Sequence, residues 1–191
     1  LDSTKLVLLD MQEIRNDSFD SRGNVLSQRV ATYATTDRAT LLDIKVIKNE
    51  DLNSLGNASK VTIYKYRLGD IEKDPSTYTD LIDVSVITTT KFDLRGNALE
   101  QIVTRYSDSS LATIIETQNI TSTYDFHDRQ LHSSIVTTNS KNEFVDRQEI
   151  DYLKYDLYGN VEDQTVPRFD STDTLIDYKV IHNTYAALVA A

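Results

Sequence analysis

The chain has 191 residues, lacks Cys and Trp, and carries a formal charge of −10 at pH 7. This charge argues against nucleic acid as a partner, because phosphate binding requires a basic face. No apolar run approaches the roughly 20 residues that span a bilayer, so we expect no membrane insertion, and the lack of Cys excludes disulfides and thiolate metal sites.

The first predicted strand opens with Leu8-Leu9-Asp10 and reaches Ile14. A tight turn follows, in which Phe19-Asp20 leads to Gly23-Asn24. We name the strand before such a turn strand B and the strand after it strand A. The first strand A carries Val30 seven residues after the glycine and Tyr33 ten residues after it. Because these two positions are three residues apart, their side chains would point to opposite faces of a regular strand. This predicts a β-bulge or a strand end between them.

The turn recurs along the chain at intervals of 33, 40, 32 and 31 residues. Gly and Asn tolerate the positive φ that a tight connection between twisted strands requires. The predicted turn residues are Gly23, Asn24, Gly56, Asn57, Gly96, Asn97, Gly159 and Asn160, with a degenerate copy at Asp128-Arg129. The longest connection from a strand A to the next strand B runs from Tyr66 to Leu81, and its Pro75 indicates a surface loop.

Strand B repeats two apolar residues and an acid, followed by isoleucine six residues after its start. The acids are Asp10, Asp43, Asp83, Glu116, Asp146 and Asp177. The isoleucines are Ile14, Ile47, Ile87, Ile120, Ile150 and Ile181. We expect the isoleucines to be buried, since a repeated identity is typical of a core slot. For the acids we expect hydrogen bonds at turns or ladder ends, or pairing with Lys and Arg on adjacent strands.

This repetition predicts an all-β fold of tandem antiparallel β-hairpin repeats, with about eleven strands that form a curled sheet or a sandwich. We expect one repeat domain over residues 1–191. It begins with a half-repeat at 1–18 and continues with repeats at about 19–50, 51–91, 92–123, 124–154 and 155–184. A partial repeat at 185–191 ends it.

The phrases FDSRGN, FDLRGN and YDLYGN resemble the signature of YD-repeat, or RHS-repeat, proteins of bacterial surfaces and toxin shells. The resemblance covers Phe19 to about Tyr185. It implies that each repeat adds hairpin strands to a long sheet, which in that family spirals around a hollow shell. The period here is longer than the family's common unit, and the turns favour Asn over Arg.

The residues suggest no catalytic chemistry, and we expect neither an enzyme nor a cofactor. His127, His132 and His182 occupy slots that unrelated residues fill in sister repeats, so we expect no metal ligation from them. Calcium at the turns through Asp20, Asp93 or Asp156 is disfavoured, because hard cations take six or more oxygens.

We expect an extracellular or cell-surface structural protein, the subunit of a head-to-tail filament or pilus-like fibre. Its partner would be the protein itself, joined through the terminal half-repeats. The assembly residues of this hypothesis are Leu8, Leu9, Ile14, Tyr185 and Leu188. The alternatives are an adhesin or carbohydrate-binding module, or a slice of an RHS-like shell. The sequons at Asn16, Asn57 and Asn119 would accept glycans in a secreted protein.

Overall fold

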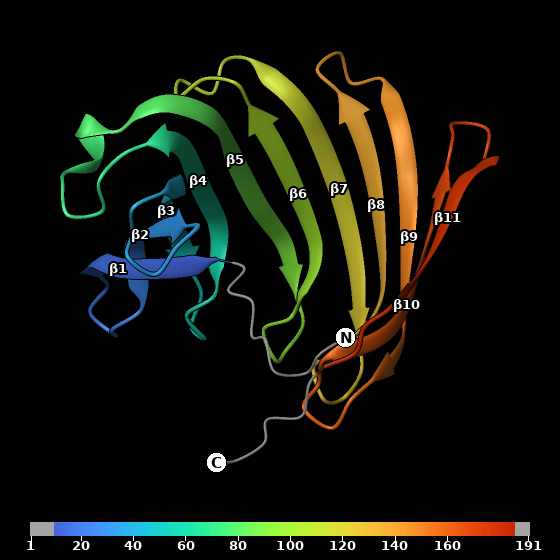
Figure 1. Ribbon diagram of the computed structural model, residues 1–191. Coiled ribbons are helices and arrows are strands. Elements are labelled where there is room, and N and C mark those ends of the chain that lie inside the picture. The colour runs from blue at the N-terminus through green and yellow to red at the C-terminus, as the bar shows by residue number, and fades with distance from the viewer. Residues whose placement is uncertain (1–9, 186–191) are drawn as a thin grey trace. The chain divides into compact units, whose positions relative to one another are not determined.

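The computed structural model describes residues 10–185, which form one antiparallel sheet in which strand order follows chain order. The strands are β1 (Met11–Phe19), β2 (Val25–Tyr33), β3 (Leu41–Leu52), β4 (Ala58–Leu68), β5 (Thr79–Phe92), β6 (Ala98–Tyr106), β7 (Ile114–Tyr124), β8 (Gln130–Asn139), β9 (Phe144–Tyr155), β10 (Val161–Phe169) and β11 (Leu175–His182) (Figure 1). The expected all-β fold of antiparallel hairpins is confirmed, as one sheet that is not closed. Within the described residues no helix is long and apolar enough to cross a membrane.

A β-bulge recurs where a strand A ends beside the start of a strand B. In the pairing of β2 with β3, Thr32 faces Asp43 but Tyr33 faces Leu41, so Leu42 is the extra residue. The same register shift recurs in the pairings of β4 with β5, β8 with β9, and β10 with β11. The register shift lies next to Tyr33, where a bulge or a strand end is expected, but the extra residue belongs to strand B and not to strand A. It also explains the two apolar residues before each acid, since the first pairs across the strands and the second is unpaired.

The turns from strand B to strand A share one hydrogen-bonded geometry. In the first, the Asp20 amide donates to the Asn24 carbonyl at 2.9 Å, and the Asp20 carbonyl accepts from the Gly23 amide at 3.1 Å. Gly23, Gly56, Gly96 and Gly159 lie in these turns with φ between +85° and +96°. Asp128, in the degenerate copy, takes the same slot with φ +64°, which Asn and Asp tolerate better than most residues.

Contacts between residues divide the chain into two compact units. Unit 1 comprises residues up to 88 together with 104–115, and unit 2 comprises 89–103 together with residues from 116 onward. Each unit is described separately below.

In unit 1 the loop between β4 and β5 covers one face of the sheet. This loop, residues 69–78, contains a single turn of 3₁₀ helix, η1 (Pro75–Thr77). Its Ile71 and Tyr78 are buried against Ala31, Tyr33, Ile44 and Val46. Pro75 therefore belongs to a covering segment that supplies two of the six residues of the core cluster, and not simply to a surface loop.

The expectation of six buried isoleucines is wrong. Ile14 is 59% exposed, and Ile47, Ile87, Ile120, Ile150 and Ile181 are only partly buried. In β3 the buried residues are Ile44 and Val46, whose parity is opposite to that of Ile47. Since successive side chains of a strand point to opposite faces, the covered face is the one that the repeated isoleucines do not occupy.

Unit 2 differs in what it buries. Within residues 10–185 the buried hydrophobic side chains all belong to unit 1. The buried side chains of unit 2 are Thr89, Ser122, Ser133, Thr137, Asp146 and Thr165. Ser122 and Ser133 face each other across β7 and β8, with hydroxyl oxygens 3.3 Å apart. Unit 2 is therefore a sheet whose described residues include no second apolar layer.

Candidate functional site

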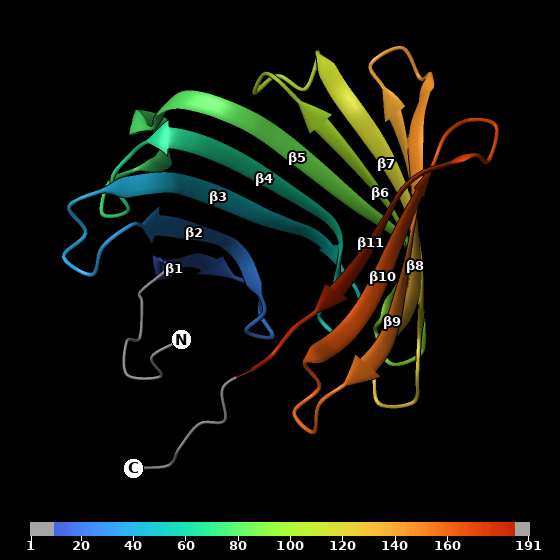
Figure 2. The same ribbon diagram turned by 45° about the vertical axis from the view of Figure 1, so that its right-hand side comes forward.

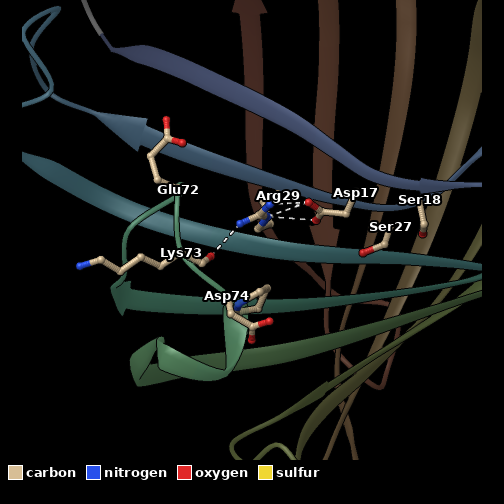
Figure 3. A pocket seen from close by; sticks show the side chains of 8 residues that line it. Asp17, Ser18, Ser27, Arg29, Glu72, Lys73 and Asp74 are labelled. Carbon is tan, nitrogen blue, oxygen red and sulfur yellow. Dashed lines mark hydrogen bonds and ion pairs between the residues drawn. The ribbon is translucent and has the colours of Figure 1, made fainter.

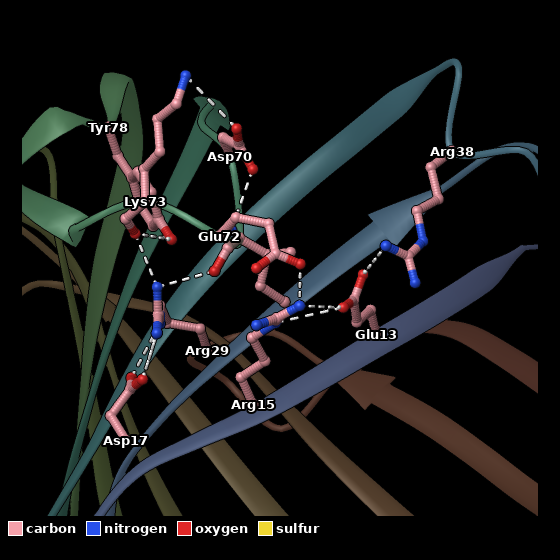
Figure 4. A network of polar contacts seen from close by, with 10 residues as sticks. Glu13, Arg15, Asp17, Arg29, Arg38, Asp70, Glu72, Lys73 and Tyr78 are labelled. Atoms are coloured by element: carbon pink, nitrogen blue, oxygen red, sulfur yellow. Dashed lines mark hydrogen bonds and ion pairs between the residues drawn. The ribbon is translucent and has the colours of Figure 1, made fainter.

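A polar network joins the first two strands of unit 1, β1 and β2, to the covering loop. Arg29 on β2 pairs with Asp17 on β1, with Nε 2.9 and 3.0 Å from the two carboxylate oxygens. Its Nη1 donates to the carbonyls of Ile71 at 2.8 Å and Lys73 at 2.7 Å (Figure 4). The hydrogen-bonded Asp17 carboxylate raises the pKa of Arg29 above its ordinary value. Arg29 therefore fastens the loop to the sheet as a permanent cation.

A second group of charges lies beside Arg29. Arg15 on β1 pairs with Glu72 of the loop and, at 3.1 Å, with Glu13. Glu13 also pairs with Arg38 at 3.2 Å, and Figure 4 shows these side chains turned toward one another. Burial raises the pKa of Tyr78, which packs next to this network. Each of these charged side chains lies beside one of opposite charge. Such an arrangement serves to hold the loop on the sheet.

An open pocket of about 510 Å³ adjoins this network. It is lined by Asp17, Ser18, Ser27, Arg29, Glu72, Lys73, Asp74 and Pro75 (Figure 3). Arg29 is already engaged by Asp17 and two loop carbonyls, and Lys73 lies 3.5 Å from Asp70. Among residues 10–185 no group of three or more His, Asp or Glu residues could hold a metal ion.

The turn aspartates use their carboxylates to hold the turn. Asp20 Oδ1 accepts the amides of Arg22 and Asn24, at 2.8 and 2.9 Å, and its Oδ2 accepts from the Asn24 side chain. Asp93 and Asp156 repeat this pattern with Asn97 and Asn160. These hydrogen bonds lower the pKa of Asp20 and Asp93 to about 2. The carboxylate oxygens that a calcium ion would need at these turns therefore already accept hydrogen bonds from the turn itself.

The same turn also joins strand A to strand B at two places that the Gly-Asn pattern does not predict. Asn139 to Glu143 and Asp170 to Thr174 make the same set of backbone hydrogen bonds, and Asn142 and Asp173 take positive φ. The signal was present as an Asn or Asp followed three residues later by another. It was overlooked because these copies lack the glycine.

The repeated acids pair with cations on neighbouring strands. Asp43 lies 3.2 Å from Lys65 on β4, and Asp83 lies 3.8 Å from Arg105 on β6. Asp146 lies 2.5 Å from Arg168 on β10. All three cations stand nine residues after the turn glycine of their repeat. For these three of the six acids cross-strand pairing is observed, whereas Asp177 lies 3.6 Å from Lys179 of its own strand.

The histidines lie apart from one another in the chain's hairpins. The ring of His127 stacks on Phe126, with centroids 3.7 Å apart. His132 lies between Glu149 and Asp151, at 3.1 and 2.8 Å. His182 lies 2.6 Å from Asp163.

Of the predicted assembly residues, Ile14 is exposed on β1, and the Tyr185 hydroxyl donates to the Val161 carbonyl at 3.0 Å. Leu8, Leu9 and Leu188 lie outside the described residues.

No protein-family model matches the chain. A search of curated proteins finds none that is similar to it.

Proposed function

We propose that the protein is a structural repeat element of the cell exterior, whose copies join edge to edge into a fibre-like assembly. The observation that carries this proposal is the unclosed sheet. Its outermost strands, β1 and β11, each pair on one side only within residues 10–185. Strand edges with open backbone groups are templates for pairing with another chain.

Unit 2 supports the same proposal. Its described residues bury polar side chains and lack an apolar core, so an extended sheet there would gain stability from further strands or from a covering surface. The conserved spacing of turns, bulges and ion pairs from repeat to repeat suits a scaffold, since every repeat presents the same edges to the next. The head-to-tail joint through the terminal half-repeats is one way to connect the copies.

Electron microscopy of the purified chain, with light scattering across a dilution series, tests this function. We expect fibres or extended assemblies that grow with concentration. A monodisperse monomer at all concentrations would contradict the proposal. A variant that lacks residues 185–191 serves as a comparison. Its assembly should be lost if the copies join head to tail through that end, and should persist if they join through the edges of the sheet.

A binding module is the second candidate, and it depends on the turn tips of unit 2. Leu94, Phe126, Leu157 and Tyr158 are largely or fully exposed at corresponding turns. Exposed aromatic rings are a common platform for sugars, as expected of an adhesin. Binding to a glycan array that is lost in a Phe126→Ala/Tyr158→Ala variant would favour this candidate. Unchanged binding, or none, would count against it.

A further inference from the structure

Strand β11 is an edge strand with apolar side chains on both of its faces. Leu175, Ile176, Tyr178 and Val180 are each a little over half exposed. Figure 2 shows β11 beside β10 with no strand on its other side. Soluble proteins usually protect such an edge with charges, prolines or bulges, because an exposed apolar edge pairs with other strands.

Strand β1, at the other edge, has that protection. Two register shifts interrupt it, between Asn16 and Ser18 and between Ser18 and Phe19. Its Glu13, Arg15 and Asp17 are held in ion pairs with other parts of unit 1. In β11 the pairing with β10 has one shift, at Ile176, and then runs without a shift from Asp177 to His182. The two edges are therefore built differently, and β11 is the one prepared for a partner.

The backbone groups that β11 leaves open follow from its pairing with β10. The Asn183 amide donates to the Glu162 carbonyl at 2.7 Å. Because these groups alternate along an antiparallel strand, the odd residues of β11 point their N–H and C=O toward β10. Within the regular stretch from Asp177 to His182, the even residues Tyr178 and Val180 then direct theirs to the free edge.

The sequence of β11 is complementary to itself in antiparallel order. When a second copy is placed with Tyr178 opposite Tyr178, Asp177 faces Lys179 of that copy and Ile176 faces its Val180. Leu175 then faces Ile181 of that copy. In this register each apolar residue faces an apolar residue of the other copy, and each charged residue faces one of opposite charge. Tyr178, whose backbone groups face the free edge, then forms a hydrogen-bonded pair with Tyr178 of the other copy.

The ion pairs inside the sheet supply an independent argument. Asp43, Asp83 and Asp146 each have a cation on the following strand A, namely Lys65, Arg105 and Arg168. Asp177 occupies the same slot in β11, where no following strand is present among residues 10–185 and the nearby cation is Lys179 of its own strand, at 3.6 Å. Lys179 of a second copy would take the place of that cation.

We propose that β11 is a two-fold joint, at which two copies of this chain pair their β11 strands antiparallel around Tyr178. The proposal deepens the edge-to-edge function above and rests on it in part. It specifies which edge joins, in which direction and in which register.

A cysteine at the proposed axis tests the register, and the chain has no Cys that would interfere. Cα atoms of a hydrogen-bonded antiparallel pair lie about 5.5 Å apart, within the roughly 4.4–6.8 Å that a disulfide spans. We expect Tyr178→Cys to form a disulfide-linked dimer on mild oxidation. The matched control is Ile14→Cys, at a similarly exposed site on β1, and we expect it to stay monomeric on a denaturing gel. If Tyr178→Cys links no faster than Ile14→Cys, the proposal is overturned.

Charge reversal tests the pairing without a covalent link. Lys179→Asp leaves Asp177 opposite Arg168 in the pairing with β10, removes the contact of Lys179 with Asp177 within the strand, and sets two pairs of like charges across the joint. We expect dimer affinity to fall about tenfold, since two cross-strand pairs change from attractive to repulsive. In Asp177→Lys/Lys179→Asp the opposite charges face each other again, and affinity should recover. Equal affinity of all three proteins would contradict the proposed register.

Sedimentation of the intact chain separates this proposal from the broader function. At about 100 μM, a dimer with a Kd near 1 μM is almost fully formed. A dimer that does not grow further supports the β11 joint and contradicts the fibre. Large assemblies that persist in Val180→Pro, which lacks one outward N–H, contradict the β11 joint and leave the fibre standing. A monomer contradicts both.

Discussion

The guanidinium Nη1 of Arg29 lies 2.8 Å from the carbonyl oxygen of Ile71 and so ties strand β2 to a residue 42 positions further along the chain. Ile71 is 1% exposed, and the guanidinium of Arg29 satisfies its backbone carbonyl with a charged hydrogen-bond donor. The contact explains how a loop without strands of its own becomes the second layer of unit 1.

Arg29→Ala should therefore destabilise unit 1 by about 2–4 kcal/mol, because it leaves two carbonyls and the Asp17 carboxylate without their donor. Urea unfolding followed by circular dichroism measures the loss. Arg15→Ala is the matched control, since Arg15 also reaches the loop through Glu72 but is more exposed. Surface pairs contribute about 0–1 kcal/mol, so an equal loss in both variants would contradict the special role of Arg29.

Gly69→Ala should loosen the covering loop by steric contact. A Cβ at Gly69 would lie 2.8 Å from Ile44 Cγ2 and 2.9 Å from Tyr78 Cδ1. Overpacking of this kind costs about 1–3 kcal/mol. Quenching of tyrosine fluorescence by iodide should increase, as Tyr78 becomes accessible. Unchanged stability and quenching would show that the loop does not pack as described.

Gly159→Ala provides a comparison with a different physical cause. A Cβ at Gly159 has no atom within 4 Å, but φ is +85°. The cost should be about 1 kcal/mol and should come from the backbone alone. Gly159→Asn should recover part of this loss in thermal melts, because Asn tolerates positive φ. Equal melting temperatures for the Ala and Asn variants would contradict this explanation.

Ile44→Ala should cost about 2–5 kcal/mol, because Ile44 is fully buried. Ile47→Ala, three residues later in the same strand, should cost clearly less, since that side chain is only partly buried. The two variants remove the same atoms, so their difference in urea unfolding measures burial directly. A larger loss from Ile47→Ala would place the core on the opposite face.

Stability should decrease in acid because of the turn aspartates. The pKa of Asp20, Asp93, Asp108 and Asp125 is lowered from 3.8 to about 2. A carboxyl group with a lowered pKa in the folded state stabilises the protein above pH 3.8, and this contribution is lost as the pH falls toward 2. Asn53 and Asn139 fill the same slot without charge. Asp93→Asn should therefore keep the turn and flatten the pH dependence of urea unfolding between pH 5 and 2. A slope identical to that of the unaltered chain would contradict this.

The sequence alone determined the hairpin order of the strands and the turns that contain glycine. Gly23 and its counterparts mark turns because few other residues adopt their φ, and this property is local. The change of parity between Val30 and Tyr33 indicated an irregularity near the end of this strand, but only the pairing of the two strands shows that the extra residue, Leu42, lies in the neighbouring strand.

Which face of the sheet is covered, and what surrounds each of its two edge strands, depended on tertiary structure. Ile44 and Ile47 are the same residue type on opposite faces of one strand, and only the position of the loop that carries Ile71 and Tyr78 decides which of them is buried. Likewise, Leu8 to Ile14 and Leu175 to Ile181 read as equivalent strands. Tertiary structure distinguishes them, because Arg15 of β1 pairs with Glu72 of the covering loop, whereas β11 pairs with β10. Local sequence determines backbone geometry, whereas burial depends on contacts between segments far apart in the chain.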